Sequence, residues 1–266
     1  YQIFYILFKL LKMRPIVFIV LIFSAPINSV FAQSINGRIN YEVKLMEDNL
    51  YYPGTLYFNK DTSVFQYKNH IEKRWFRNEG IGKIQSEDTD SIGRLAIRAM
   101  NSNNPQFVIR DFCGSDVKIY IDTVEMKWVL SNEQKMIGEY LCKKATTRFR
   151  GRDYIAWYCP EIAVSIGPLK YNGLPGLILE ITTTDKKLNI YVTKIFLTSM
   201  QLVSVPLLKE KLVSRKEFNL CLDNDSIKEY YKNKAIIAQL QKEFPDIQVS
   251  DRPFIPRSEN ATEVDQ

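Results

Sequence analysis

Few residues in this 266-residue chain have a type and spacing that could carry out chemistry. His70 is the single histidine, and it lies among charged neighbours. A Ser–His or Cys–His nucleophile would have to use it, yet the sequence contains no Gly-x-Ser-x-Gly elbow. The four cysteines show no zinc-type spacing and no Cys-x-x-Cys pair. We therefore predict a protein that is not an enzyme and that has no metal and no other cofactor.

Carboxylate chemistry is the enzymatic alternative that remains open. A glycosidase-like hydrolase needs only two acidic side chains at a fixed separation, which a sequence does not reveal. Glu161 and Glu180 flank the part of the chain that is richest in glycine and proline, and they are the candidates for such a pair. A purely structural subunit of the cell envelope is a third alternative.

The first 32 residues have the features of an export signal. From Met13 onward a basic start precedes an apolar run from Ile16 to Phe23, and Ala32 supplies a small residue for cleavage. We interpret residues 1–12 as an upstream extension and predict that the mature chain begins at Gln33. It should be periplasmic or secreted, with no membrane span after cleavage.

Export changes the meaning of the net charge of +6. Three basic residues, Lys9, Lys12 and Arg14, lie in the export segment, so the mature charge is only +3. A basic and aromatic stretch around Arg150 resembles a nucleic-acid surface, but strand alternation divides its side chains between two faces. One face carries Lys144, Arg148 and Trp157, and the other carries Lys143, Arg152, Tyr154 and Tyr158. We therefore predict no nucleic-acid partner.

Residues 141–159 are predicted to form a β-hairpin. Arg150-Gly151 has the composition of a two-residue turn, so residues whose numbers add up to 301 should face each other. This register places Arg148 opposite Asp153, which is a favourable pairing of charges.

The same register bears on the cysteines, because an exported protein meets an oxidising compartment. Cys142 lies opposite Cys159, within the Cα separation of a disulfide, so we predict that these two are bonded. Cys113 and Cys221 then remain as the second possible pair.

Short strands dominate the rest of the mature chain, with brief polar connections and no helix between most of them. This pattern predicts a mainly β (α+β) protein with a single curved antiparallel sheet, similar to an open half-barrel. We expect strands at 35–46, 54–58, 63–68, 106–112, 117–124, 127–130, in the hairpin, and at 177–184 and 188–198.

Helical patterns come late in the chain. Ser226 and Glu229 form a capping-box pattern that should open a helix ending before Pro245, and residues 206–218 are a shorter helical candidate. We expect one or two such helices to cover a face of the sheet. Residues 33–250 are thus predicted to be one β-rich domain, and the polar residues 251–266 a flexible tail.

The most distinctive stretch is a bend with several glycines and prolines. Its residues are Gly167, Pro168, Gly173, Leu174, Pro175, Gly176, Leu177 and Ile178. The glycines can adopt conformations closed to other residues, and the prolines stiffen the bend. A phosphate-binding loop is excluded because the Gly-Lys-Ser/Thr ending is absent and a strand rather than a helix should follow.

These residues resemble the GLPGLI family of Bacteroidetes envelope proteins. The resemblance extends upstream through Trp128, residues 137–145, Gly151-Arg152 and 156–158, and Cys159 departs from it. It implies an exported β-rich protein of undetermined molecular function, with an outer-membrane transporter or another envelope protein as a partner.

Combining the bend with the hairpin gives a predicted binding site in the concavity of the sheet. Its residues would be Arg152, Trp157, Tyr158, Tyr171 and Leu174, and its ligand would be apolar or peptide-like. We therefore predict a non-enzymatic binding or accessory module of the cell envelope.

Overall fold

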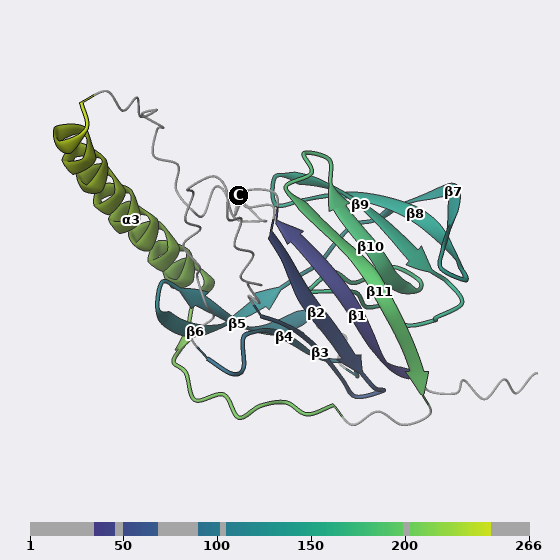
Figure 1. Cartoon of the computed structure of the whole chain (residues 1–266). Coiled ribbons are helices and arrows are strands. Elements are labelled where there is room, and N and C mark those ends of the chain that lie inside the picture. Colours follow the sequence, from purple (N-terminus) through teal and green to yellow (C-terminus); the bar gives the residue numbers. More distant parts are fainter. Residues whose placement is uncertain (1–34, 46–49, 69–89, 102–104, 199–202, 246–266) are drawn as a thin grey trace, which may run out of the picture. The chain divides into compact units, whose positions relative to one another are not determined.

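The computed structural model describes residues 35–45, 50–68, 90–101, 105–198 and 203–245, and every structural statement below concerns this part of the chain. His70, the predicted export segment and the predicted tail lie outside the described residues. The described part consists of strands and one helix (Figure 1). They are β1 (Asn36–Leu45), β2 (Leu50–Phe58), β3 (Thr62–Tyr67), β4 (Arg94–Ala99), β5 (Gln106–Cys113), β6 (Asp116–Thr123), β7 (Val129–Ile137), β8 (Tyr140–Phe149), β9 (Arg152–Cys159), β10 (Leu177–Thr183), β11 (Leu188–Thr198), β12 (Leu212–Val213) and α3 (Arg215–Glu243).

All twelve strands belong to one sheet, which confirms the predicted fold class. Their order is β12-β6-β5-β4-β3-β2-β1-β11-β10-β9-β8-β7. Every pairing is antiparallel except the short parallel contact between β12 and β6. Two meanders, β1 to β6 and β7 to β11, are therefore joined side by side through β1 and β11. Each predicted strand overlaps an observed one, whereas β4 and β12 had not been predicted.

The sheet curls strongly. Seven strands separate β6 from β9 in the sheet order, which would place them about 38 Å apart in a flat sheet. Asp122 on β6 nevertheless bonds to Arg150, in the turn that precedes β9, at 2.7 Å. Only residues 124–128 connect β6 to β7 at the far side of the sheet. The two sides of the sheet must therefore approach each other, as the predicted half-barrel requires.

The core lies on the inner face of the curl. Ile39, Tyr41 and Val43 alternate along β1 and are almost fully buried, as a strand with one buried face requires. Tyr41 pairs with Gly54, and the ring of Phe65 lies over that glycine. A Cβ on Gly54 would lie 2.5 Å from Cζ of Phe65. Small and aromatic residues thus interlock across neighbouring strands at the centre of the sheet.

The hairpin of β8 and β9 has the predicted register. Pairs run from Lys143–Tyr158 to Phe149–Arg152, and every pair of numbers adds up to 301. Arg150 and Gly151 both have positive φ values, 46° and 78°, which is the conformation of a type I′ turn. Arg148 and Asp153 form the expected ion pair, with Nη1 and Oδ2 3.1 Å apart.

The predicted Cys142–Cys159 disulfide is wrong for this structure, in which both are buried free thiols. The regular β8–β9 pairing ends at Lys143–Tyr158, one pair before the cysteines. Cys159 instead ends β9, and its carbonyl accepts a hydrogen bond from Ile162 as the chain turns away. Burial, and after it the nearby Cys159, raises the pKa of Cys142 to about 12, so this thiol stays protonated at neutral pH.

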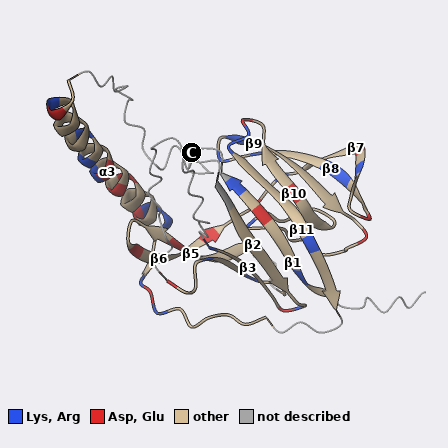
Figure 2. Ribbon diagram, in the orientation of Figure 1, with Lys and Arg blue, Asp and Glu red and all other residues tan. Residues whose placement is uncertain are grey.

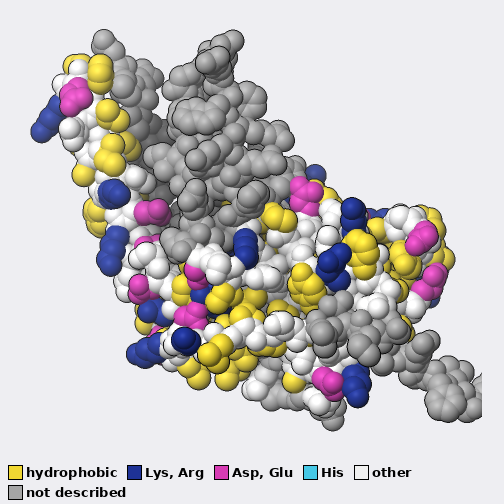
Figure 3. Space-filling view, turned by 60° about the horizontal axis from the view of Figure 1, so that its bottom comes forward, with side chains coloured by type: hydrophobic (Ala, Val, Ile, Leu, Met, Phe, Trp, Pro, Cys, Tyr) yellow, Lys and Arg dark blue, Asp and Glu magenta, His cyan; other side chains and the backbone are white. Residues whose placement is uncertain are grey.

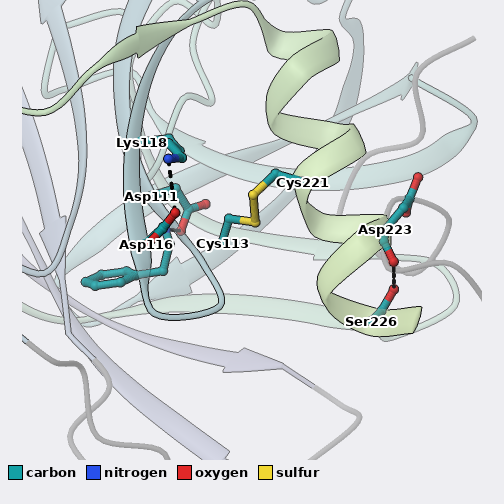
Figure 4. The surroundings of a disulfide bond; sticks show 8 residues. Asp111, Cys113, Asp116, Lys118, Cys221, Asp223 and Ser226 are labelled. Atoms are coloured by element: carbon teal, nitrogen blue, oxygen red, sulfur yellow. Dashed lines mark hydrogen bonds and ion pairs between the residues drawn. A yellow bond between two sulfur atoms is a disulfide. The ribbon is translucent and has the colours of Figure 1, made fainter. Parts of the chain in front are cut away.

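The disulfide that does form joins Cys113, the last residue of β5, to Cys221 in α3 (Figure 4). Their Cα atoms are 6.1 Å apart, and the sequence separation is 108 residues. Closing a loop of this length stabilises the folded state by about 4–5 kcal/mol on the chain-entropy model. Cys113 and Cys221, the second possible pair in the sequence, therefore form the covalent link between helix and sheet.

Helix α3 begins earlier than predicted. The same Ser-x-x-Glu pattern occurs at Ser214 and Glu217, and this is the capping box that opens the helix. Ser226 lies inside the helix, where its hydroxyl donates to the carbonyl of Asp223. Of the shorter helical candidate at 206–218, residues 206–211 form no helix, and only residues from Arg215 onward are helical, as the start of α3. The predicted end is confirmed, because the C-cap is Phe244, directly before Pro245.

The helix does not cover a face of the sheet as predicted. Of its residues, Phe218 and Ser226 are buried, and the Phe218 ring stacks on Tyr120 at 4.7 Å. Apolar side chains farther along, such as Tyr231 and Phe244, are exposed, and Figure 2 shows Lys, Arg, Asp and Glu residues distributed along the helix. Among the described residues, no helix combines the length and apolar character that a membrane span requires.

Candidate functional site

The predicted binding residues do not form one exposed site. Arg152 and Tyr158 belong to the buried face of β9, at 9% and 3% exposure. Trp157 points to the opposite face of the same strand, as strand alternation demands. Tyr171 and Leu174 are each 1% exposed. Four of the five residues are therefore buried, and Tyr158, Tyr171 and Leu174 belong to the hydrophobic core.

The inner face of the curl is occupied by residues 160–176, which connect β9 to β10. Tyr171 from this segment packs against the ring of Tyr154, with centroids 5.5 Å apart. Arg98 on β4 reaches the carbonyl of Ser165. Where the segment enters β10, the hydroxyl of Tyr41 donates to the carbonyl of Ile178 at 2.7 Å. The chain thus places its own side chains where the predicted apolar ligand would lie.

The glycines of the bend allow this segment to pack closely. A Cβ on Gly176, whose φ is +153°, would lie 2.2 Å from the carbonyl oxygen of Cys159. A Cβ on Gly167 would lie 2.7 Å from the Cβ atom of Ile178. Trp128, which precedes β7, donates its indole N–H to the carbonyl of Asn172 at 2.8 Å. The Gly-Leu-Pro-Gly-Leu-Ile motif therefore has a structural role, which is to fit residues 160–176 against the sheet.

Asp122 is the centre of a charged cluster that the sequence did not reveal. It is 1% exposed and binds three cationic side chains from separate parts of the chain: Arg150 at 2.7 Å, Lys170 at 2.5 Å and Arg215 at 2.6 Å. Burial by itself would raise the pKa of Asp122, but the hydrogen bonds and positive charges outweigh it and hold the pKa well below its usual range.

The Asp122 cluster joins parts of the fold that are far apart in sequence. Arg150 comes from the β8–β9 turn, Lys170 from the segment inside the curl, and Arg215 from the first turn of α3. Because Asp122 remains ionised, it cannot act as a general acid near neutral pH. Its arrangement is that of a structural clasp, an ionic link that ties β6 to the β8–β9 turn, to the segment inside the curl and to α3.

The carboxylates proposed for hydrolysis have different surroundings. Glu180 forms an ion pair with Lys135, whose ammonium lies 4.5 Å from the centre of the Trp157 ring. Glu161 is exposed on the connection after β9. Both carboxylates contribute to the raised pKa of Cys142, so they lie in the same region. In the described ranges, no group of three or more His, Cys, Asp or Glu side chains is arranged to hold a metal ion.

Among the described residues, β7 is an edge strand with no strand paired to its outer side. It ends the sheet order and pairs with β8 on one side. At the other end of the sheet, the edge of β6 is covered. There β12 pairs with β6, and the amide of Ile119 donates to the carbonyl of Lys211. An unprotected edge presents backbone donors and acceptors to a further strand.

The register of β7 shows which backbone groups are available. Ile137 pairs with Tyr140 across the two-residue turn Gly138-Glu139. Residues that flank such a turn form a hydrogen-bonded pair, and the pattern then alternates along the strand. The N–H and C=O groups of Gln134 and Met136 therefore point away from β8 and toward the open edge.

Exposed apolar side chains accompany this edge. Leu130 is 55% exposed, Met136 59% and Leu141 40%. Leu130 pairs with Ala145 and Met136 with Leu141, so all three side chains lie on one face. We call them the edge patch. A patch beside an open strand edge suits an extended peptide with apolar residues at alternate positions.

A bulge limits the length of the open edge. Pairing between β7 and β8 is interrupted between Leu130 and Gln134, and Glu133 in the bulge bonds to Lys144 at 2.8 Å. Bulges and edge lysines such as Lys135 discourage indiscriminate sheet extension. The regular part that remains, residues 134–137, favours recognition of a short segment.

The sequence did not identify the edge. Hydrophobic alternation predicts that a strand exists, but the place of that strand in the sheet depends on long-range pairing. The available signal was that residues 129–137 alternate poorly and contain Ser131-Asn132-Glu133, which is more typical of an edge than of a central strand.

Comparisons with known proteins give one short family match and weak similarities to solved structures. A family model described as "Protein of unknown function (Porph_ging)" matches residues 150–180, from the β8–β9 turn into β10. Two solved structures of PNGF-II, in space groups P21 and C2, are each 14% identical to this chain. The P21 match covers 73% of this chain and 34% of that one, with a TM-score of 0.47. The C2 match covers 68% and 31%, with a TM-score of 0.44.

This chain thus spans about a third of the length of those solved chains. No curated protein matches it.

Proposed function

We propose that this protein is a non-enzymatic accessory module of the cell envelope that binds an extended segment of a partner protein by strand addition to β7. The observation that carries the proposal is the open edge at Gln134 and Met136 with the edge patch beside it. The export signal and the resemblance to the GLPGLI family support an envelope location and an outer-membrane protein as the partner.

A ligand inside the curl is the weaker alternative. Tyr171 and Leu174 already fill that face and are 1% exposed, so an apolar ligand would have to displace residues 160–176. Removing two such side chains from the core costs about 2–5 kcal/mol each. Strand addition at β7 requires no such rearrangement.

The expected complex is reversible. Four backbone hydrogen bonds from Gln134 and Met136 contribute about 0.5–1.5 kcal/mol each. Full burial of the edge patch adds about 1.5–3 kcal/mol for each side chain. Association costs about 4–15 kcal/mol, which offsets much of this gain. Such a balance suits an accessory protein that joins and leaves a larger assembly.

The test uses a photo-crosslinking amino acid at Val129, which is 68% exposed on β7, in native envelopes. We expect Gln134→Pro to reduce the crosslinked partner about tenfold, because proline removes an outward N–H and places its ring at the edge. This N–H makes no bond to β8, so the sheet should remain intact. Crosslinking yield from the mutant and wild-type proteins is the measurement.

Two controls make this result specific. Gln134→Ala changes the side chain but keeps the N–H, and it should preserve the crosslink. A crosslinker at Asp116, which is 66% exposed on β6, should not capture the same partner. Equal yields from the proline and alanine variants would show that the β7 edge is not the binding site.

A further inference from the structure

The segment before β12 forms no helix or strand, but its residues alternate in exposure. Val205, Leu207, Lys209 and Lys211 are exposed, whereas the alternate residues Pro206, Leu208 and Glu210 are partly buried. We call the four exposed residues the outward stripe. Leu207, at 78%, is the most exposed large apolar side chain recorded in the described residues. Alternation of this kind is expected when one side of an extended segment rests on a sheet.

The inner side of the segment is firmly anchored. The carboxylate of Glu210 accepts a hydrogen bond from Nε of Arg110, at 2.6 Å, and the Arg110 side chain is only 3% exposed. The carbonyl of Lys211 accepts from the amide of Ile119, and Leu212 pairs with that same residue. These contacts hold the C-terminal part of the segment, next to Lys209 and Lys211, against β6.

The outward stripe combines apolar and cationic side chains in sequence. Val205 and Leu207 form its apolar half, and Lys209 and Lys211 its cationic half. Leu212, 58% exposed, and Lys216, also exposed, continue the same two types toward α3. Figure 3 shows hydrophobic side chains close to Lys and Arg side chains on the face that it turns forward.

We propose that the outward stripe binds the surface of a bilayer that contains anionic lipids. Leu207 and Val205 enter the boundary between headgroups and acyl chains, while Lys209 and Lys211 reach the lipid phosphates. A lipid surface explains why the stripe pairs apolar residues with cations, since each lysine near an anionic surface contributes about fivefold in affinity. The stripe lies beside β6, whereas the proposed partner site is on β7, so the two sites use different strands.

The test is cosedimentation with lipid vesicles. It uses the predicted mature chain, which begins at Gln33. We expect binding to vesicles that contain phosphatidylglycerol, weaker binding to pure phosphatidylcholine, and a loss of binding at high salt. Replacing both stripe lysines, in Lys209→Glu/Lys211→Glu, should weaken binding by about 25-fold or more. Leu207→Ser should weaken it about threefold or more.

The matched control is Lys186→Glu/Lys187→Glu, which makes the same charge change at the exposed β10–β11 turn. It should retain most of the vesicle binding. If it lost as much binding as the stripe variant, net charge rather than the stripe would be responsible. Unchanged binding of Leu207→Ser, or equal binding of wild type to both kinds of vesicle, would also overturn the proposal. Circular dichroism of each variant separates these outcomes from a loss of folding.

Discussion

Replacing Asp122 by alanine is expected to lower the free energy of unfolding by about 3–5 kcal/mol, because it leaves three cationic side chains in a largely buried cluster without their shared anion. The effect should exceed that of any exposed ion pair, since Asp122 joins three separate parts of the fold. Urea unfolding followed by tryptophan fluorescence measures it as a shift in the midpoint.

Asp153→Asn is the matched control for Asp122. Its ion pair with Arg148 lies on the same hairpin but is 50–67% exposed, so the loss should be about 0–1 kcal/mol. A similar midpoint for both variants would contradict the stabilising role of the Asp122 cluster. The pH dependence follows from the lowered pKa of Asp122: its contribution is present above the pKa of an unfolded aspartate, about 3.9, and is lost as the pH falls toward the folded value.

The second large effect is expected for Gly176→Ala. The new Cβ would lie 2.2 Å from the carbonyl oxygen of Cys159 and 2.6 Å from its carbonyl carbon, so the backbone itself must move. Backbone strain and overpacking each cost about 1–3 kcal/mol, so we expect a destabilisation of about 3 kcal/mol or more. Residues 160–176 would then fit poorly inside the curl, and thermal unfolding should occur at a lower temperature.

Gly138→Ala separates the steric clash from the effect of a positive φ. Gly138 has a φ of +60°, but no atom lies within 4 Å of the position that a Cβ would take. Its replacement should cost only about 1–2 kcal/mol, which is the strain of alanine in a left-handed conformation. If Gly176→Ala were no worse than this control, the close fit of the bend would not be important for stability.

Local patterns in the sequence were sufficient for much of the fold. The turn Arg150-Gly151 fixed the register of β8 and β9 because a two-residue hairpin permits only one register. Most other strands were found from alternation, but β4 was missed. Its inward-facing positions include Arg94 and Arg98, which interrupt the apolar pattern that identifies a strand.

Long-range features could not be predicted in the same way. The Cys113–Cys221 disulfide depends on where α3 meets the end of β5, whereas the regular β8–β9 pairing ends one pair before Cys142 and Cys159. The helix boundary was misplaced because two Ser-x-x-Glu patterns occur, at Ser214 and Ser226, and tertiary packing of Phe218 favours the first.

The candidate site was the least predictable part. The bend motif was recognised, but its burial inside the curl follows from a sheet of twelve strands whose order the sequence does not display. Tyr171 and Leu174 are therefore core residues, while the accessible edge at Gln134 and Met136 has no conspicuous motif. Edge position depends on which strands pair last, and only the complete sheet reveals it.

The most direct test of the account is residue-resolved hydrogen exchange of the protein with and without the partner captured through Val129. Strand addition predicts slower exchange for the amides of Gln134 and Met136, with no change in residues 160–176. Slower exchange in residues 160–176 with an unchanged β7 would contradict the account and return the binding site to the inside of the curl.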